Sequence, residues 1–132
     1  MGGGGRIKSK PKGGFRSTYE YNISKYISRT PELCDRVGYE SISLAYTTSH
    51  KYKPDFILPN GAIIEAKGYF TSTDRSKMLQ VHKAHPELKI YFMFLKAHNK
   101  ISTGSKTTYA SWCDRHGFEW IEGTEFPIDW SK

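Results

Sequence analysis

Asp55, Glu65 and Lys67 are ionisable residues that lie within residues 54–67, an otherwise mostly apolar stretch. Glu65 and Lys67 are two positions apart, so on a β-strand both side chains point to the same face. The turn-forming residues 59–61 would fold Asp55 back beside them. Charged groups are costly to bury unless they are paired or bind a metal. Two carboxylates and a carbonyl oxygen suit Mg²⁺ or Mn²⁺, and a lysine beside them can orient or deprotonate an attacking water.

Each of these residues also has a purely structural interpretation. Glu65 and Lys67 could form the charged face of an exposed strand, and Asp55 could simply begin a strand. Glu20, a fourth candidate, is the last residue of Ser17-Thr-Tyr-Glu and could be the acid of a helix capping box. The combination of all four residues at this spacing favours the chemical interpretation.

The hydrophobic pattern predicts an α/β fold in one domain, with a mixed central β-sheet flanked by helices. Three helices are expected: one at 17–28, one that begins within 71–74 and runs to 85, and one at 108–116. Five strands are expected, at 37–46, 52–58, 62–67, 89–95 and 118–121, with a loop at 47–51. The order αβββαβαβ places Glu20 on the first helix and the other three candidates on a hairpin.

The formal net charge of +7 indicates a polyanionic partner, and the charge is concentrated at the N-terminus. The first 16 residues contain no acid and five bases, which are Arg6, Lys8, Lys10, Lys12 and Arg16. We therefore predict a flexible basic arm at 1–15 that lies along phosphates, and a folded domain at 16–132. The alternative is a tail that only improves solubility. A second basic stretch, 88–113, includes Lys106.

Several classes of protein are excluded by the sequence. No apolar run approaches the roughly 20 residues that span a bilayer, and the N-terminus lacks the apolar stretch of a secretory signal. We therefore expect a cytoplasmic protein without a membrane partner. Cys34 and Cys113 lack metal-ligand spacing and are expected to be reduced thiols. Residues 103–107 lack the first glycine and the Gly-Lys pair of a phosphate loop, so no nucleotide cofactor is expected.

Pro54-Asp55, followed after nine residues by Glu65-Ala66-Lys67, resembles the motif of the PD-(D/E)XK nucleases. A preceding helix with an acid such as Glu20 completes the usual core of that superfamily. The chain is also similar to the phage endonuclease I family, which resolves four-way DNA junctions, over short stretches spread along nearly its whole length. These stretches are 14–17, Tyr52, 54–56, 58–61, 65–68, 74–75, 85–88, 104–105 and 116–117. The chain stops at Lys132, where that family would have a further basic extension.

The resemblance implies a structure-selective endonuclease that hydrolyses phosphodiesters at four-way (Holliday) and other branched DNA junctions. It implies two divalent ions per active site, Mg²⁺ or Mn²⁺. Asp55 would bridge the ions, Glu65 and the Ala66 carbonyl would hold one, and Glu20 would help to hold the other. Metal-activated water would then attack in line with the leaving 3′-oxygen. The alternatives are a related nuclease that nicks mismatched or duplex DNA, and a DNA-binding module without catalysis.

The residues expected to contact DNA come from the arm, the first turns of two helices and the second basic stretch. They are Arg6, Lys8, Lys10, Lys12, Arg16, Ser17, Arg75, Lys77 and Lys106. For Arg75 and Lys77 a solvated helix face is the alternative. The resemblance further implies a homodimer in which residues 37–51 cross between subunits. Glu20 would then come from one subunit and Asp55, Glu65 and Lys67 from the other.

Overall fold

The computed structural model describes residues 14–46 and 50–132, and its centre is a mixed five-stranded sheet. The strands follow the order β1-β4-β5-β6-β7 and span Gly38–Tyr39 (β1), Phe56–Ile57 (β4), Ile63–Lys67 (β5), Ile90–Phe94 (β6) and Glu119–Glu122 (β7). β1, β4 and β5 pair antiparallel, whereas β5, β6 and β7 are parallel. A separate antiparallel pair consists of Leu44–Ala45 (β2) and Lys51–Tyr52 (β3).

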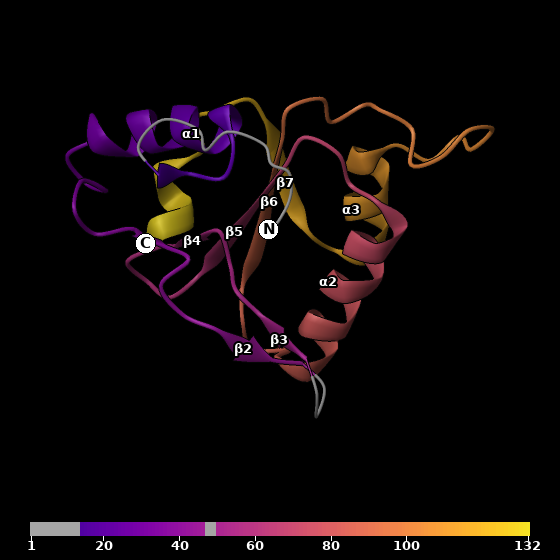
Figure 1. Ribbon diagram of the computed structural model, residues 1–132, viewed down its shortest axis with the longest axis horizontal. Coiled ribbons are helices and arrows are strands. Elements are labelled where there is room, and N and C mark those ends of the chain that lie inside the picture. The colour runs from indigo at the N-terminus through magenta and orange to yellow at the C-terminus, as the bar shows by residue number, and fades with distance from the viewer. Residues whose placement is uncertain (1–13, 47–49) are drawn as a thin grey trace.

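Helices cover both faces of this sheet (Figure 1). They are α1 (Thr18–Ser28), α2 (Ser72–Ala84), α3 (Tyr109–His116) and a C-terminal 3₁₀ helix, η2 (Ile128–Ser131). α2 and α3 lie on one face, and α1 and η2 lie on the other. Among the described helices, none is long and apolar enough to cross a membrane.

The sheet separates two hydrophobic cores. Ile63 of β5 packs with Met78 of α2 and Trp112 of α3, while Ile64 packs with Ile23 of α1 and with Trp130. Because side chains alternate along a strand, Glu65 and Lys67 share the α2–α3 face with Ile63. The sequence of β5 thus places two charged residues on a face that is otherwise core.

The predicted mixed sheet and three helices are confirmed, but two predicted strands are wrong. The expected strand at 37–46 is broken into β1 and β2, because Glu40 has a positive φ of 48° that no extended strand tolerates. The expected strand at 52–58 is broken at Pro54, which lacks the N–H that a central ladder needs. The two halves, β3 and β4, belong to different sheets.

Other predictions have mixed outcomes. The turn at 59–61 is confirmed, since Gly61 has a φ of 90° and its N–H donates to the Leu58 carbonyl at 2.9 Å. The two cysteines are free, as expected. η2 was not predicted. Most of the arm, and residues 47–49 of the expected loop, lie outside the described residues.

Candidate active site

Asp55 lies one residue before β4, at the point where the ladder between β4 and β5 ends. The pairing Phe56↔Ile64 continues in register to place Asp55 opposite Glu65. At this point a side-chain hydrogen bond takes the place of the next backbone hydrogen bond between β4 and β5. The Asp55 Oδ2 accepts it from the Ala66 N–H at 2.9 Å. Among the described residues no donor reaches Oδ1. The sheet therefore fixes the carboxyl group while one of its oxygens stays available.

Glu65 is 3% exposed, and both of its carboxylate oxygens have partners. The Tyr52 hydroxyl donates to Oε1 at 2.5 Å, and Lys67 Nζ lies 2.9 Å from Oε2. Tyr52 is itself 2% exposed and belongs to the small sheet. A buried carboxylate with two charge-compatible donors has one well-defined orientation.

Lys67 is held between two acids from different elements. Besides Glu65, its Nζ lies 3.4 Å from Oδ1 of Asp74, whose Oδ2 accepts from the Thr71 N–H at the start of α2. Burial alone would lower the pKa of Lys67, but Glu65 and Asp74 together raise it above the ordinary value. Burial likewise acts against ionisation of Asp74, and Lys67 with the Thr71 bonds lowers the pKa of Asp74 overall. With its pKa raised by these two acids, the Lys67 ammonium is suited to orienting water or balancing phosphate charge.

Glu20 does not complete a capping box. Ser17 caps α1, since its hydroxyl accepts from the Glu20 N–H at 3.0 Å. The Glu20 side chain instead accepts from the Tyr39 hydroxyl at 2.7 Å and from the Arg16 N–H at 3.1 Å, both at Oε1. It is 6% exposed. The structural interpretation of Glu20 as a capping acid is therefore wrong, and the carboxylate is held toward β1 instead.

One pocket of about 260 Å³ brings the four predicted catalytic residues together. It is lined by residues of α1, β5 and α2, of the segment before α1, of the end of β1 and of the segment between β3 and β4. They are Arg16, Glu20, Glu40, Lys53, Asp55, Glu65, Ala66, Lys67 and Lys77. Burial, followed by the charges of Glu65 and Glu20, raises the pKa of Asp55 well above its ordinary value. Burial also raises the pKa of Glu20; hydrogen bonds from Tyr39 and Arg16 oppose this rise, and the charges of Glu40 and Glu65 add to it. The lining contains four acids and four bases, but the acids lie close enough together for the charge of Glu65 to raise the pKa of both Asp55 and Glu20.

The donor set fits a hard cation that keeps several waters. Lys67 uses its carbonyl to pair with β6, where Leu95 N–H donates to it at 3.1 Å, so the backbone groups of Ala66 point to the opposite edge. At that edge the Ala66 N–H donates to Asp55, and Ala66 is among the residues that line the pocket. Among the described residues no three His, Cys, Asp or Glu side chains are grouped as a ready metal site. An ion would therefore need the backbone carbonyl and waters as well as carboxylates.

Only some of the predicted DNA-binding residues lie at the pocket. Arg16 and Lys77 line the pocket, and Ser17 caps α1. Arg16 also pairs with Glu40, at 2.6 Å from Nε to Oε2. The Arg75 guanidinium donates to the Phe70 carbonyl at 2.7 Å, which ties it to the backbone outside the pocket. Lys106 is exposed on the loop before α3, and the arm residues Arg6, Lys8, Lys10 and Lys12 lie outside the described residues.

Sequence reasoning missed Lys53, Glu40 and Tyr52. Lys53 is two positions before Asp55, so the same alternation that pairs Glu65 with Lys67 could have placed it. Nothing in the sequence could have found Glu40 or the Tyr52 contact, since both depend on the broken strands described above.

Comparison with known proteins agrees with the resemblance seen in the sequence. The family model for phage endonuclease I matches residues 1–132. Endonuclease I of Escherichia phage T7 is 35% identical over 135 residues, which cover 100% of this chain and 88% of that relative. Endodeoxyribonuclease 1 of Enterobacteria phage T3 is 41% identical over 106 residues, which cover 78% of this chain and 68% of that relative. A match over the whole length and identities of this size show that the chain belongs to the phage endonuclease I family.

Proposed function

We propose that this protein is a metal-dependent DNA endonuclease that hydrolyses phosphodiesters at four-way and other branched DNA junctions. The observation that carries the proposal is the convergence of Glu20, Asp55, Glu65 and Lys67 on one pocket. Two relatives are named an endonuclease and an endodeoxyribonuclease. The position of Asp55 before β4 and of Glu65 and Lys67 within β5 supports assignment to the PD-(D/E)XK core.

The carboxylates would hold two divalent ions, Mg²⁺ or Mn²⁺. Asp55 would bridge them, Glu65 and the Ala66 carbonyl would hold one, and Glu20 would help to hold the other. Such ions supply Lewis acidity and lower the pKa of water that they bind. The raised pKa of Asp55 supports this role, because a carboxylate disfavoured by its neighbours is stabilised by a cation.

The protein's own groups orient the substrate and the nucleophile. Lys67 remains protonated between Glu65 and Asp74, so it donates hydrogen bonds to an attacking water or a phosphate oxygen. Lys53 and Lys77 line the same pocket and attract the DNA phosphate. Tyr52 keeps Glu65 in one orientation throughout. These fixed donors cost no reorganisation when charge develops on the phosphate.

We further propose that the protein acts as a homodimer with exchanged strands. Glu20 precedes the β2–β3 pair, whereas Asp55, Glu65 and Lys67 follow it. Within the chain Leu44 pairs with Tyr52 and Ala45 with Lys51, and the same antiparallel register can form between two copies. Opening the pair would keep every contact of the pocket but draw it from two chains. A two-fold symmetric junction cut in two strands fits a symmetric dimer.

Two other functions use the same features. A nuclease of this fold could nick mismatched or duplex DNA, and a DNA-binding module could use the basic arm alone. Asp55 and Glu65 disfavour the second, because a binding module gains nothing from burying carboxylates next to one another. The nuclease for mismatched or duplex DNA differs from the proposed function only in the DNA that it cuts.

The test incubates the full chain with a four-way junction and with a linear duplex of the same sequence, in Mg²⁺ or in EDTA. We expect cleavage of the junction in Mg²⁺, little cleavage of the duplex, and none in EDTA. Equal cleavage of both DNAs would establish a nuclease with another target. Junction binding without cleavage under any divalent ion would establish the binding module. The site of action is expected to be the cytoplasm of the host cell.

A further inference from the structure

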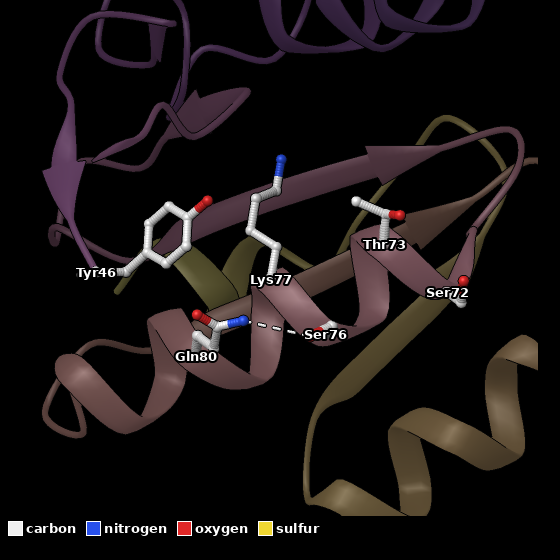
Figure 2. Close-up of a pocket in the computed structure, with 6 residues that line it drawn as sticks. All are labelled: Tyr46, Ser72, Thr73, Ser76, Lys77 and Gln80. Carbon is white, nitrogen blue, oxygen red and sulfur yellow. Dashed lines mark hydrogen bonds between the residues drawn. The ribbon is translucent and has the colours of Figure 1, made fainter. Parts of the chain in front are cut away.

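A second groove lies beside the catalytic pocket, between β2 and the exposed side of α2. It has a volume of about 380 Å³ and is lined by Tyr46, Ser72, Thr73, Ser76, Lys77 and Gln80. Figure 2 shows the Tyr46 ring and the Lys77 amine directed toward the same space above α2, with Thr73 on that side of the helix. None of its lining residues takes part in the chemistry proposed above, except that Lys77 lines both cavities.

The groove is lined by hydrogen-bond donors and contains no acid. Ser76 Oγ accepts from Gln80 Nε2 at 3.2 Å, and among the described residues no acceptor takes its own hydroxyl proton. The side chains, not the end of the helix, supply these donors, because Thr71 and Asp74 already form a capping box at the start of α2. Hydroxyl, amide and ammonium groups without a carboxylate are the set that proteins use to hold nucleic-acid phosphates.

The groove is continuous with the catalytic pocket through Lys77. Its ammonium lies 5.7 Å from the centre of the Tyr52 ring, and the Tyr52 hydroxyl contacts Glu65. One side chain therefore separates the groove from the catalytic carboxylates. A DNA strand with its scissile phosphate at Asp55 and Glu65 has its neighbouring phosphates within reach of α2, since one strand carries a phosphate at every nucleotide.

We propose that the groove between β2 and α2 is a phosphate subsite, which binds the phosphodiester backbone of the DNA strand next to the phosphate that is cut. This inference rests on the proposed nuclease function and adds Ser72, Thr73, Ser76 and Gln80 to the DNA-binding surface. Because five of the six lining residues are neutral, the groove fixes the path of the strand more than it adds long-range attraction. In an exchanged dimer the α2 residues would still line this groove, whichever subunit provides β2.

The test places a negative charge in the groove and then neutralises single phosphates of the DNA that the groove is proposed to bind. Ser76→Asp and the isosteric Gln80→Glu each add one charge, Ser76→Asn is the neutral control, and Ser28→Asp adds the same charge at an exposed position on α1. Junction binding is measured in EDTA, with all phosphates intact or with single neutral methylphosphonates at positions flanking the cleavage site. Circular dichroism and Tm establish that each variant is folded.

We expect Ser76→Asp and Gln80→Glu to weaken junction binding about tenfold, and Ser76→Asn and Ser28→Asp to stay within about threefold of wild type. A methylphosphonate at one or two positions beside the cut should weaken wild-type binding but restore binding by Ser76→Asp. If both charged variants bind like Ser28→Asp, or if no methylphosphonate restores binding, the subsite is wrong. Wild-type cleavage of the junction in Mg²⁺ is measured separately, so its absence would overturn the nuclease function and not the groove.

Discussion

The ammonium nitrogen of Lys67 lies 2.9 Å from Oε2 of Glu65, two residues earlier on the same strand. This contact makes the proposed catalytic lysine and one proposed metal ligand parts of one charge pair, with Asp74 as a second acid at 3.4 Å. Removing Lys67 leaves the buried Glu65 carboxylate without its charge partner. The effects of substitutions at these positions should therefore depend strongly on one another.

Asp55→Ala, Glu65→Gln and Lys67→Ala should each abolish cleavage while junction binding persists. Each change removes a proposed ion ligand or the ammonium proposed to orient water, whereas the proposed phosphate contacts of the arm and the surface lysines are unchanged. We expect kcat to fall by more than about a hundredfold. Gel-shift binding in EDTA and single-turnover cleavage in Mg²⁺ give the two quantities. Full activity in any one of the three, or wild-type activity in EDTA, would contradict the assignment.

Asp55→Asn should stabilise the fold at neutral pH when no divalent ion is present. Burial and the neighbouring acids raise the pKa of Asp55 above its unfolded value. Between those two pKa values the native state binds more protons than the unfolded state, so wild-type stability falls as pH rises through that range. We expect Tm of Asp55→Asn to exceed that of wild type by about 3–8 °C at neutral pH, with a smaller difference in acid.

The same experiment reports on the metal. Mg²⁺ that binds the native site should raise the Tm of the wild type and leave Asp55→Asn unchanged. Differential scanning calorimetry with and without Mg²⁺ measures both effects. A variant that is less stable than wild type at neutral pH would contradict the prediction that burial and the neighbouring acids make the ionised Asp55 carboxylate unfavourable.

Tyr52→Phe should lower cleavage activity without unfolding the protein. The change removes the hydroxyl that donates to buried Glu65 Oε1, so the carboxylate loses a partner and its fixed orientation. We expect about a tenfold loss of kcat, an increase in the Mg²⁺ needed for half-maximal rate, and about 1–2 kcal/mol less stability. Tyr69→Phe is the matched control, because Tyr69 is 79% exposed. If the two variants have the same kcat, Mg²⁺ requirement and stability, the Tyr52 hydroxyl does not contribute to the active site.

Deleting residues 1–13 should reduce the dependence of binding on salt. The deletion removes Arg6, Lys8, Lys10 and Lys12. If each contacts a phosphate, the slope of log K against log salt becomes shallower by ~3 to 4. Fluorescence anisotropy with a labelled junction over a range of NaCl measures the slope. An unchanged slope would mean that the arm only improves solubility.

Heterodimers of Glu20→Ala and Lys67→Ala chains should regain activity at one site. In an exchanged dimer one pocket collects both substitutions and the other collects none, although each homodimer is inactive. Co-refolded chains with different tags isolate the heterodimer, and nicking of a supercoiled junction plasmid reports a single active site. Purified heterodimers that do not nick would rule out exchange and leave the nuclease function intact.

The hairpin that carries Asp55, Glu65 and Lys67 could be predicted because three independent patterns agree there. The alternation of β5, the turn at 59–61 and the apolar surroundings all place these side chains together. The partners that fix them could not be predicted, since Tyr52 reaches Glu65 and Tyr39 reaches Glu20 only through tertiary packing. The break in the strand expected at 37–46 could not be predicted either, because the positive φ at Glu40 is not encoded by a glycine. The break at Pro54 is different, since a proline is a sequence signal against a central strand.

Tyr52 belongs at once to the small β2–β3 sheet and to the catalytic pocket. Its backbone is placed by pairing with Leu44, and its hydroxyl places Glu65. The pairing of β3 with β2 and the orientation of the Glu65 carboxylate therefore depend on the same residue, whether the partner strand comes from the same chain or from a second one. A chain whose β3 is unpaired should lack the orienting contact on Glu65, so we expect formation of the β2–β3 pair to precede nuclease activity.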